Sequence, residues 1–241
     1  MANMFEKLWD RFSSLLFPDL TRCISCGREL KEGYLCEECE KEFYLNDEHR
    51  CYWCSRPTVS IDDNLCEQCK QSGNNYELCI APLLYKGTVH DLVHKFKYGD
   101  RRDLGTFFVD FMVKEYEKLP EPDFIIPVPI WSGKFKDRIY STAHELGEIL
   151  SKRVGVEYRE DLVEKIRDTG TQTALKGEER QLNVKGSFRA VSTKEFKDKK
   201  ILIIDDVYTT GATVNELAKV LKGKKASAVY VLTAAIATGK R

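Results

Sequence analysis

The hydrophobic pattern from residue 77 onward alternates between two kinds of segment. Continuous apolar runs, which are typical of strands buried on both faces of a sheet, fall at 78–85, 124–129, 201–204 and 227–238. Apolar residues at helical spacing, which predict amphipathic helices, fall at 89–96, 104–119, 138–154 and 214–221. Strands that alternate with helices predict an α/β fold with a parallel sheet, whose ligands bind at the carboxyl ends of the strands.

The stretch 200–221 changes from a strand pattern to a helix pattern across a polar turn. Its apolar run stops at Asp205 and Asp206, and small or hydroxyl residues follow: Thr209, Thr210, Gly211, Ala212 and Thr213. A loop that opens onto a helix N-terminus offers N–H groups to a phosphate, and glycine lets the backbone approach closely. The carboxylates repel a phosphate, but they accept hydrogen bonds from a sugar diol or orient the waters of Mg²⁺. The alternative is structural: the aspartates cap a turn, and Thr213 caps the helix.

Eight of the nine cysteines form four C-x-x-C pairs: Cys23/Cys26, Cys36/Cys39, Cys51/Cys54 and Cys66/Cys69. The first pair recurs 28 positions later and the second recurs 30 positions later, which indicates an internal duplication. Without an export signal, such pairs favour metal ligands over disulfides, and four thiolates in each half fit two tetrahedral Zn²⁺ sites. Sequential pairing and a crossed, RING-like pairing both suit the spacing, and eight reduced cysteines without metal are the alternative. Cys79 is left over and is expected to be a buried thiol.

Residues 1–20 carry apolar side chains on one helical stripe, which charged residues interrupt. The charges argue against the core of a signal peptide, so we expect an amphipathic helix packed on the protein. Docking of this helix on a membrane surface is the second interpretation. The chain has no run of 18 apolar residues, so we expect no membrane span and a cytoplasmic protein.

Charge is distributed unevenly, although the formal net charge of the whole chain is zero. Residues 21–70 contain seven basic and eleven acidic residues, a formal charge of −4, whereas residues 71–241 carry +5. An acidic zinc module is poorly suited to wrapping a nucleic-acid backbone, so direct nucleic acid contact is not indicated by charge. Protein contact, or capping of the larger domain, suits it better. The positive part of the chain is the one that attracts a polyanionic substrate.

Two polar segments are candidates for contact with such a substrate. Residues 165–185 lack apolar periodicity, which predicts a long loop that closes as a lid before a short strand at 187–191. Residues 96–102 end a predicted helix with lysine, arginine and a turn glycine, which suit a pyrophosphate group. The alternative for this turn is an ordinary solvated charged surface.

The motif ILIIDDVYTTGAT resembles the ribose-5-phosphate loop of type I phosphoribosyltransferases. With the cysteine pairs, HKFKYGD, FIIPVPI and TALKGEERQLNVKGSF, it follows the order of motifs in the ComF/GntX family, and this resemblance covers nearly the whole chain. It implies a parallel-sheet type I phosphoribosyltransferase fold with a small N-terminal zinc-binding module. The implied organisation is an amphipathic helix at 1–20, a double zinc-ribbon-like module at 21–72 and a phosphoribosyltransferase-like domain at 73–241.

The resemblance also implies a site for phosphoribosyl pyrophosphate with Mg²⁺. Asp205 and Asp206 would contact the ribose hydroxyls, and the five residues from Thr209 to Thr213 would wrap the 5-phosphate. The implied contacts to the pyrophosphate are Lys97, Tyr98, Gly99 and Arg138. The loop that would close over the site and exclude water carries Lys176, Arg180 and Gln181. The eight paired cysteines would bind two structural zinc ions.

One segment departs from the family pattern. The family usually has an arginine, glycine and a Phe-Asn-Gln run where this chain has RIYST at 138–142, so an amide pair suited to recognising a base or acceptor is missing. The sequence therefore favours two alternative functions. One is a phosphoribosyltransferase that acts in DNA uptake during natural competence or in nucleotide metabolism. The alternative is a non-catalytic subunit that binds a nucleotide or sugar phosphate and docks a DNA-translocating helicase through its zinc module.

Overall fold

A computed structural model describes residues 21–47, 49–58, 64–131, 140–169, 182–191 and 194–238. The predicted amphipathic helix at 1–20 lies outside these residues. The described helices are α2 (Glu37–Lys41), α3 (Glu67–Ser72), α4 (Gly87–Tyr98), α5 (Leu104–Tyr116), α6 (Thr142–Val154) and α8 (Ala212–Gly223). The described strands are β1 (Leu78–Ile80), β2 (Leu83–Leu84), β3 (Phe124–Pro127), β4 (Glu157–Tyr158), β5 (Val163–Lys165), β6 (Phe188–Ala190), β7 (Lys200–Tyr208) and β8 (Ala228–Ile236). None of the described helices has the length and apolar content that a membrane span requires.

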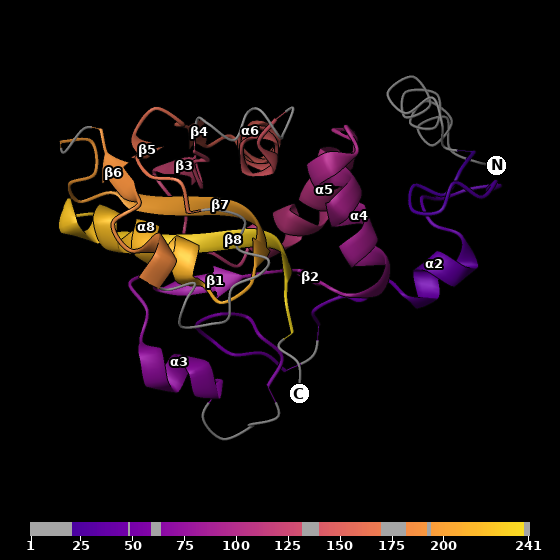
Figure 1. Cartoon of the computed structure of the whole chain (residues 1–241), viewed down its shortest axis with the longest axis horizontal. Helices are drawn as coiled ribbons and strands as arrows, with labels where there is room; N and C mark the ends of the chain where they lie inside the picture. Colours follow the sequence, from indigo (N-terminus) through magenta and orange to yellow (C-terminus); the bar gives the residue numbers. More distant parts are fainter. Residues whose placement is uncertain are drawn as a thin grey trace.

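The main sheet has six strands in the order β1-β8-β7-β3-β4, with β2 also paired to β8 (Figure 1). Every neighbouring pair in it is parallel, so the predicted parallel α/β fold is confirmed. The long strands β7 and β8 occupy the centre, and their apolar residues are buried almost without exception. A separate antiparallel pair, β5 and β6, flanks the segment predicted to be a long loop.

Each face of the sheet is covered by different elements. Helices α4, α5 and α6 place Phe96, Phe108 and Leu150 against Leu202 and other residues of one face. Helix α8 covers the opposite face, where its apolar side chains join a core cluster that includes Ile203. Three cysteines of the second pair of C-x-x-C motifs belong to that same cluster: Cys51, Cys54 and Cys69. The second half of the cysteine module is therefore part of the main hydrophobic core.

The structure differs from the sequence-based expectation in where strands begin and end. The apolar run at 78–85 forms two short strands, because Pro82 has no N–H group and the carbonyl oxygens of Ala81 and Pro82 accept hydrogen bonds from Asn46. The strand expected to stop before Asp205 continues to Tyr208, because β8 supplies ladder partners as far as Ile236. The two aspartates thus lie within the carboxyl end of β7.

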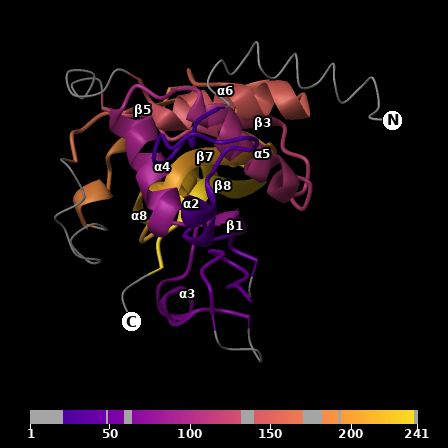
Figure 2. The ribbon, with the colours of Figure 1, turned by 90° about the vertical axis from the view of Figure 1, so that its right-hand side faces the viewer.

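The cysteine module forms two separate units around the sheet. Figure 1 and Figure 2 show α3, in the second unit, below the sheet and α2, in the first unit, beside α4 and α5. The first unit contacts α4 through Thr88, whose N–H and hydroxyl donate to the carbonyl oxygens of Glu42 and Cys39. The second unit contacts the carboxyl end of β7, where the candidate site lies.

Candidate functional site

The turn between β7 and α8 is tightly constrained at Gly211. This glycine is the N-cap of α8 and has φ +78°, a left-handed conformation that favours glycine. The hydroxyl of Tyr208 lies directly beneath it and bonds to the hydroxyl of Tyr76 over 2.9 Å. Burial raises the pKa of Tyr208, so this hydroxyl stays protonated. Gly211 rather than Thr213 caps the helix, so the structural alternative for Thr213 does not hold.

We expect Gly211→Ala to lower the free energy of unfolding by about 3 kcal/mol, because an alanine is strained at this φ and its Cβ would overlap the Tyr208 hydroxyl. Urea denaturation measures the change. Gly155→Ala is the matched control: Gly155 has φ +74°, but open space surrounds its Cβ position. Equal losses in the two variants would show that the contact with Tyr208 contributes nothing.

Asp205 and Asp206 have different surroundings, because neighbouring residues of a strand point to opposite faces. The Asp206 side chain is 10% exposed; its Oδ1 lies 2.7 Å from Lys97 Nζ, and its Oδ2 accepts a hydrogen bond from the Thr142 hydroxyl. Asp205 is partly exposed, and its Oδ1 accepts the backbone N–H of Asp206 over 2.9 Å. The two carboxylates are therefore held by different groups and are not interchangeable.

The cleft beside Asp205 is narrow. It is lined by Asp205, Val207, Tyr208, Thr209, Gly211, Thr213 and Val214, and it encloses only about 10 Å³. A sugar phosphate is larger than the space between these side chains as they lie in this structure. A wider cavity of about 500 Å³ lies on the other side of the loop, between α8 and the residues that follow α3.

Lys97 lies in the last turn of α4, before Tyr98 and Gly99, which were also predicted to contact a pyrophosphate. Its ammonium pairs with Asp206, so in this structure it lies inside the site and faces a carboxylate. Tyr98 is 53% exposed and packs against the ring of His94, and Gly99 is the C-cap of α4. The structure therefore brings Lys97 to Asp206 and leaves Tyr98 on the surface. Arg138, Lys176, Arg180 and Gln181 lie outside the described residues.

Residues 140–142, where the chain departs from the family pattern, are engaged in internal contacts. The Tyr140 hydroxyl donates to the carbonyl oxygen of Phe96, and the Thr142 hydroxyl donates to Asp206. Ser141 is buried, and its hydroxyl has no hydrogen-bond partner among the described residues. These side chains fix the position of Asp206 and of the end of α4.

Two residues that the sequence-based reasoning missed donate hydrogen bonds to the turn after β7. Arg56 Nη2 donates to the carbonyl oxygen of Thr209 over 2.7 Å, and Gln68 Nε2 donates to that of Thr210 over 2.9 Å. Both come from the second half of the cysteine module. The available signal was the difference between LCEEC at 35–39 and LCEQC at 65–69, since only the second has an amide donor at this place.

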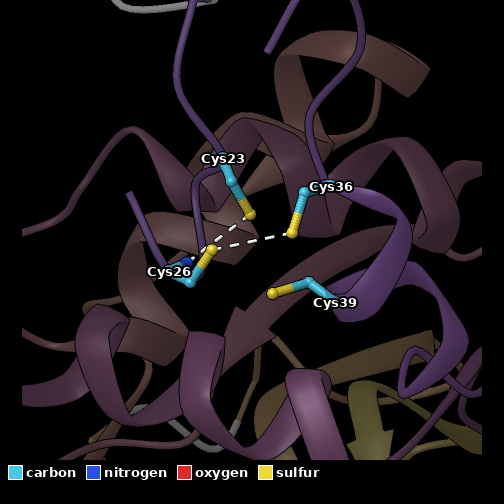
Figure 3. Close-up of side chains that lie close together, drawn as sticks. All are labelled: Cys23, Cys26, Cys36 and Cys39. Atoms are coloured by element: carbon cyan, nitrogen blue, oxygen red, sulfur yellow. Dashed lines mark hydrogen bonds between the residues drawn. The ribbon is translucent and has the colours of Figure 1, made fainter. Parts of the chain in front are cut away.

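The eight paired cysteines converge in two groups of four. Cys23, Cys26, Cys36 and Cys39 form one group, and Cys51, Cys54, Cys66 and Cys69 form the other, with the sulfur atoms of each group within 4.8 Å of one another. The structure therefore has the sequential pairing and not the crossed one. Figure 3 shows the first four sulfur atoms pointing toward a common centre.

The geometry of both groups suits zinc. A tetrahedral site with Zn–S bonds of about 2.3 Å separates its sulfur atoms by roughly 3.8 Å. The Sγ atoms of Cys26 and Cys36 are 3.6 Å apart, and so are those of Cys54 and Cys66. Four cysteine thiolates this close together repel one another and need a positive partner. A divalent cation supplies that partner, so the residues present fit structural zinc.

Comparison with known proteins identifies two families within the chain. Residues 12–70 match the double zinc ribbon domain, and residues 139–240 match the phosphoribosyl transferase domain. The first match and the two cysteine groups together support two structural zinc ions. The second match and the parallel sheet assign the larger part of the chain to the phosphoribosyltransferase type of α/β fold.

Curated relatives match over most of their length. Competence protein F of Haemophilus influenzae is 28% identical over 216 residues, which cover 83% of this chain and 90% of the relative. DNA utilization protein YhgH of Escherichia coli is 29% identical, with 82% and 94% covered. Competence protein ComFC of Streptococcus pneumoniae is 27% identical, with 83% and 93% covered.

Solved phosphoribosyltransferases are more distant. Glutamine phosphoribosylpyrophosphate amidotransferase from B. subtilis is 19% identical at a TM-score of 0.36; the match covers 56% of this chain and 26% of that enzyme. A hypoxanthine-guanine phosphoribosyltransferase from Bacillus anthracis is 16% identical at a TM-score of 0.34, with 55% and 68% covered. The chain thus spans about a quarter of the first enzyme.

Proposed function

The chain belongs to the ComF/GntX family, and from this premise we propose that it binds phosphoribosyl pyrophosphate with Mg²⁺ and acts in DNA uptake or DNA utilization. The proposed organisation is an amphipathic helix at 1–20, a double zinc ribbon at 21–72 and the sugar-phosphate-binding domain at 73–241. The observation that carries the proposal is the carboxyl end of β7, where two aspartates and a glycine-capped turn open onto α8. Competence and DNA utilization are the roles in the relatives' names, and they come to this chain as part of the proposal.

In this proposal each group of the ligand has its own partners. The N–H and hydroxyl groups of the five residues from Thr209 to Thr213 bind the 5-phosphate, which the N-terminus of α8 also favours. Asp205 and Asp206 accept hydrogen bonds from the ribose hydroxyls. When the ligand binds, the Lys97 ammonium moves from the Asp206 carboxylate to the pyrophosphate. The ribose hydroxyls then take the place of the ammonium at Asp206.

Mg²⁺ suits the carboxylate of Asp205, because this ion prefers one or two carboxylates together with oxygen atoms of the substrate. When bound, it would supply charge neutralisation for the departing pyrophosphate. Arg138 is proposed to assist Lys97, and the segment with Lys176 and Arg180 is proposed to close over the site and exclude water. In the transfer itself, an acceptor attacks C1 of the ribose while the bond from C1 to the pyrophosphate oxygen breaks.

We expect the double variant Asp205→Asn/Asp206→Asn to lose binding of phosphoribosyl pyrophosphate in isothermal titration calorimetry with Mg²⁺ present. The expected loss is at least a hundredfold, because an amide accepts sugar hydroxyls less strongly than a carboxylate and does not hold Mg²⁺. Asp198→Asn is the matched control, since it removes an exposed carboxylate from the opposite end of the sheet. Unchanged affinity in the folded double variant would refute the assignment of this site.

A second function, ligand binding without turnover, is favoured by one observation. Ser141 and Thr142 occupy the place of the family's amide pair; Ser141 is buried, and the Thr142 hydroxyl is engaged in an internal bond to Asp206. The chain would then serve as a sugar-phosphate-binding subunit beside a DNA-translocating helicase. Release of pyrophosphate in the presence of bases and amines separates the two functions. Tight binding without release across that panel supports the subunit, and release with any acceptor supports the transferase.

A further inference from the structure

The two halves of the duplicated zinc ribbon carry an arginine and a partner at equivalent positions. Arg28 stands five residues after Cys23, as Arg56 stands five residues after Cys51. Arg28 Nη2 donates to Glu38 Oε2, and Arg56 Nη1 donates to Gln68 Oε1, over 2.7 Å in each case. The duplication therefore preserved this contact and changed the partner from a carboxylate to an amide.

The change of partner coincides with a change of surroundings. Arg28 and Glu38 form an ion pair whose side chains are 56% and 68% exposed. Arg56 and Gln68 instead lie against the turn after β7 and donate to the carbonyl oxygens of Thr209 and Thr210. A glutamate at position 68 has no N–H group to donate, so the glutamine is what this contact requires.

These two bonds fix the orientation of successive peptide groups in the turn. In a trans peptide the carbonyl oxygen and the following N–H point in opposite directions. Because Arg56 and Gln68 bind the carbonyl oxygens of Thr209 and Thr210, the N–H groups of Thr210 and Gly211 face away from the zinc ribbon. An anion at this turn needs donors with a fixed direction.

We propose that Arg56 and Gln68 are positioning residues for the anion-binding turn, so that the second zinc ribbon is a functional part of the sugar-phosphate site and the first is not. This inference rests on the proposed function. The residues just after this ribbon also contact the same region. The N–H and side-chain amide of Asn75 donate to Asn215 Oδ1 on α8 over 2.7 and 3.0 Å, and Tyr76 bonds to Tyr208.

The positions of Arg56 and Gln68 also connect the turn to the second metal site. Gln68 stands between Cys66 and Cys69, and the carbonyl oxygen of Arg56 accepts the N–H of Cys51 over 2.8 Å. A metal ion that fixes these cysteines therefore also fixes the positions of Arg56 and Gln68. Metal binding at the second site is thus expected to order the turn after β7. The first site has no contact with this turn among the described residues.

The test exchanges the two partners between the halves. Gln68→Glu keeps an oxygen that accepts a hydrogen bond from Arg56 but loses the N–H group that donates to the Thr210 carbonyl oxygen. Glu38→Gln makes the opposite change in the first half. Zinc content is measured first, and two zinc ions per chain are expected in both variants. Amide hydrogen exchange then measures protection of residues 205–213, and calorimetry measures affinity for phosphoribosyl pyrophosphate with Mg²⁺.

We expect Gln68→Glu to speed exchange in the turn and to weaken binding about tenfold, as the loss of one well-placed hydrogen bond does. Glu38→Gln should leave both quantities unchanged. Arg56→Ala and Arg28→Ala form a second matched pair, which keeps the test decisive if Gln68→Glu fails to fold. Unchanged exchange in the variants of Arg56 and Gln68, or faster exchange with undiminished affinity, would overturn the inference. If the wild-type chain binds no sugar phosphate, the proposed function fails, and the exchange data alone decide whether the turn is held by this pair.

Discussion

Replacing Asp206 with asparagine is expected to lower the free energy of unfolding by about 3 kcal/mol, whereas Asp205→Asn should lower it by less than about 1 kcal/mol. The Asp206 carboxylate pairs with Lys97, whose side chain is only 18% exposed, so the variant leaves an ammonium in a mostly buried place without its carboxylate. Asp205 is partly exposed, and an asparagine keeps the oxygen that accepts the Asp206 N–H. Urea denaturation of the three proteins measures the difference.

A double-mutant cycle tests whether the ion pair is the cause. Lys97→Met removes the ammonium and retains an apolar stem of similar length, so Asp206→Asn/Lys97→Met should be more stable than the sum of the single losses predicts. Arg153→Met with Asp110→Asn is a suitable control cycle, because that pair lies 3.3 Å apart with both side chains about half exposed. Strict additivity at Lys97 and Asp206 would contradict the interpretation.

This stability effect bears on function because the same carboxylate is proposed to accept a ribose hydroxyl. A ligand that brings its own anion for Lys97 and its own hydroxyls for Asp206 replaces both partners at once. Without the ligand, the ion pair occupies the positions that these ligand groups would take at Lys97 and Asp206. Ligand affinity measured with Asp205→Asn alone reports on the site without disturbing the pair.

The sequence allowed the parallel sheet and the zinc module to be predicted because both depend on local patterns. Apolar runs identify the central strands β7 and β8 without knowledge of their neighbours. The repeated C-x-x-C spacing identifies the metal ligands, although the choice between sequential and crossed pairing needed the positions of the sulfur atoms. The end of β7 was misplaced because a ladder partner on β8, and not the polarity of Asp205, decides where this strand ends.

The site itself was only partly predictable, because its important contacts join distant parts of the chain. The motif at 201–213 points to the aspartates and the turn, but nothing local pairs Lys97 with Asp206, 109 positions later. The contact of Arg56 with Thr209 joins a small zinc ribbon to the main domain across an even longer separation. The replacement of a glutamate by Gln68 in the second half was visible in the sequence, yet its meaning depends on the carbonyl oxygen of Thr210 being nearby.

Loss of zinc from the second half is expected to destabilise the whole chain far more than loss from the first. Structural zinc sites contribute on the order of 10 kcal/mol to folding in small domains. Cys54 is only 1% exposed and belongs to the core cluster that includes Tyr76, Cys79 and Ile203. Cys26 is exposed, and the first half meets the main domain at the margin through α4 and the ring of Phe107.

The matched variants are Cys54→Ser and Cys26→Ser, which each remove one ligand at an equivalent position of the repeat. Zinc content measured by atomic absorption should fall from two ions per chain to one in both. Thermal unfolding should then show a loss of more than 10 °C for Cys54→Ser, since the main core loses its anchor, and a smaller loss confined to a separate early transition for Cys26→Ser. Equal shifts in one common transition would contradict this asymmetry, because they would mean that the first half is as integral to the core as the second. The expected difference follows from where the duplicated halves pack: one lies within the main core beside the turn after β7, and the other lies against the outer surface of α4 and α5.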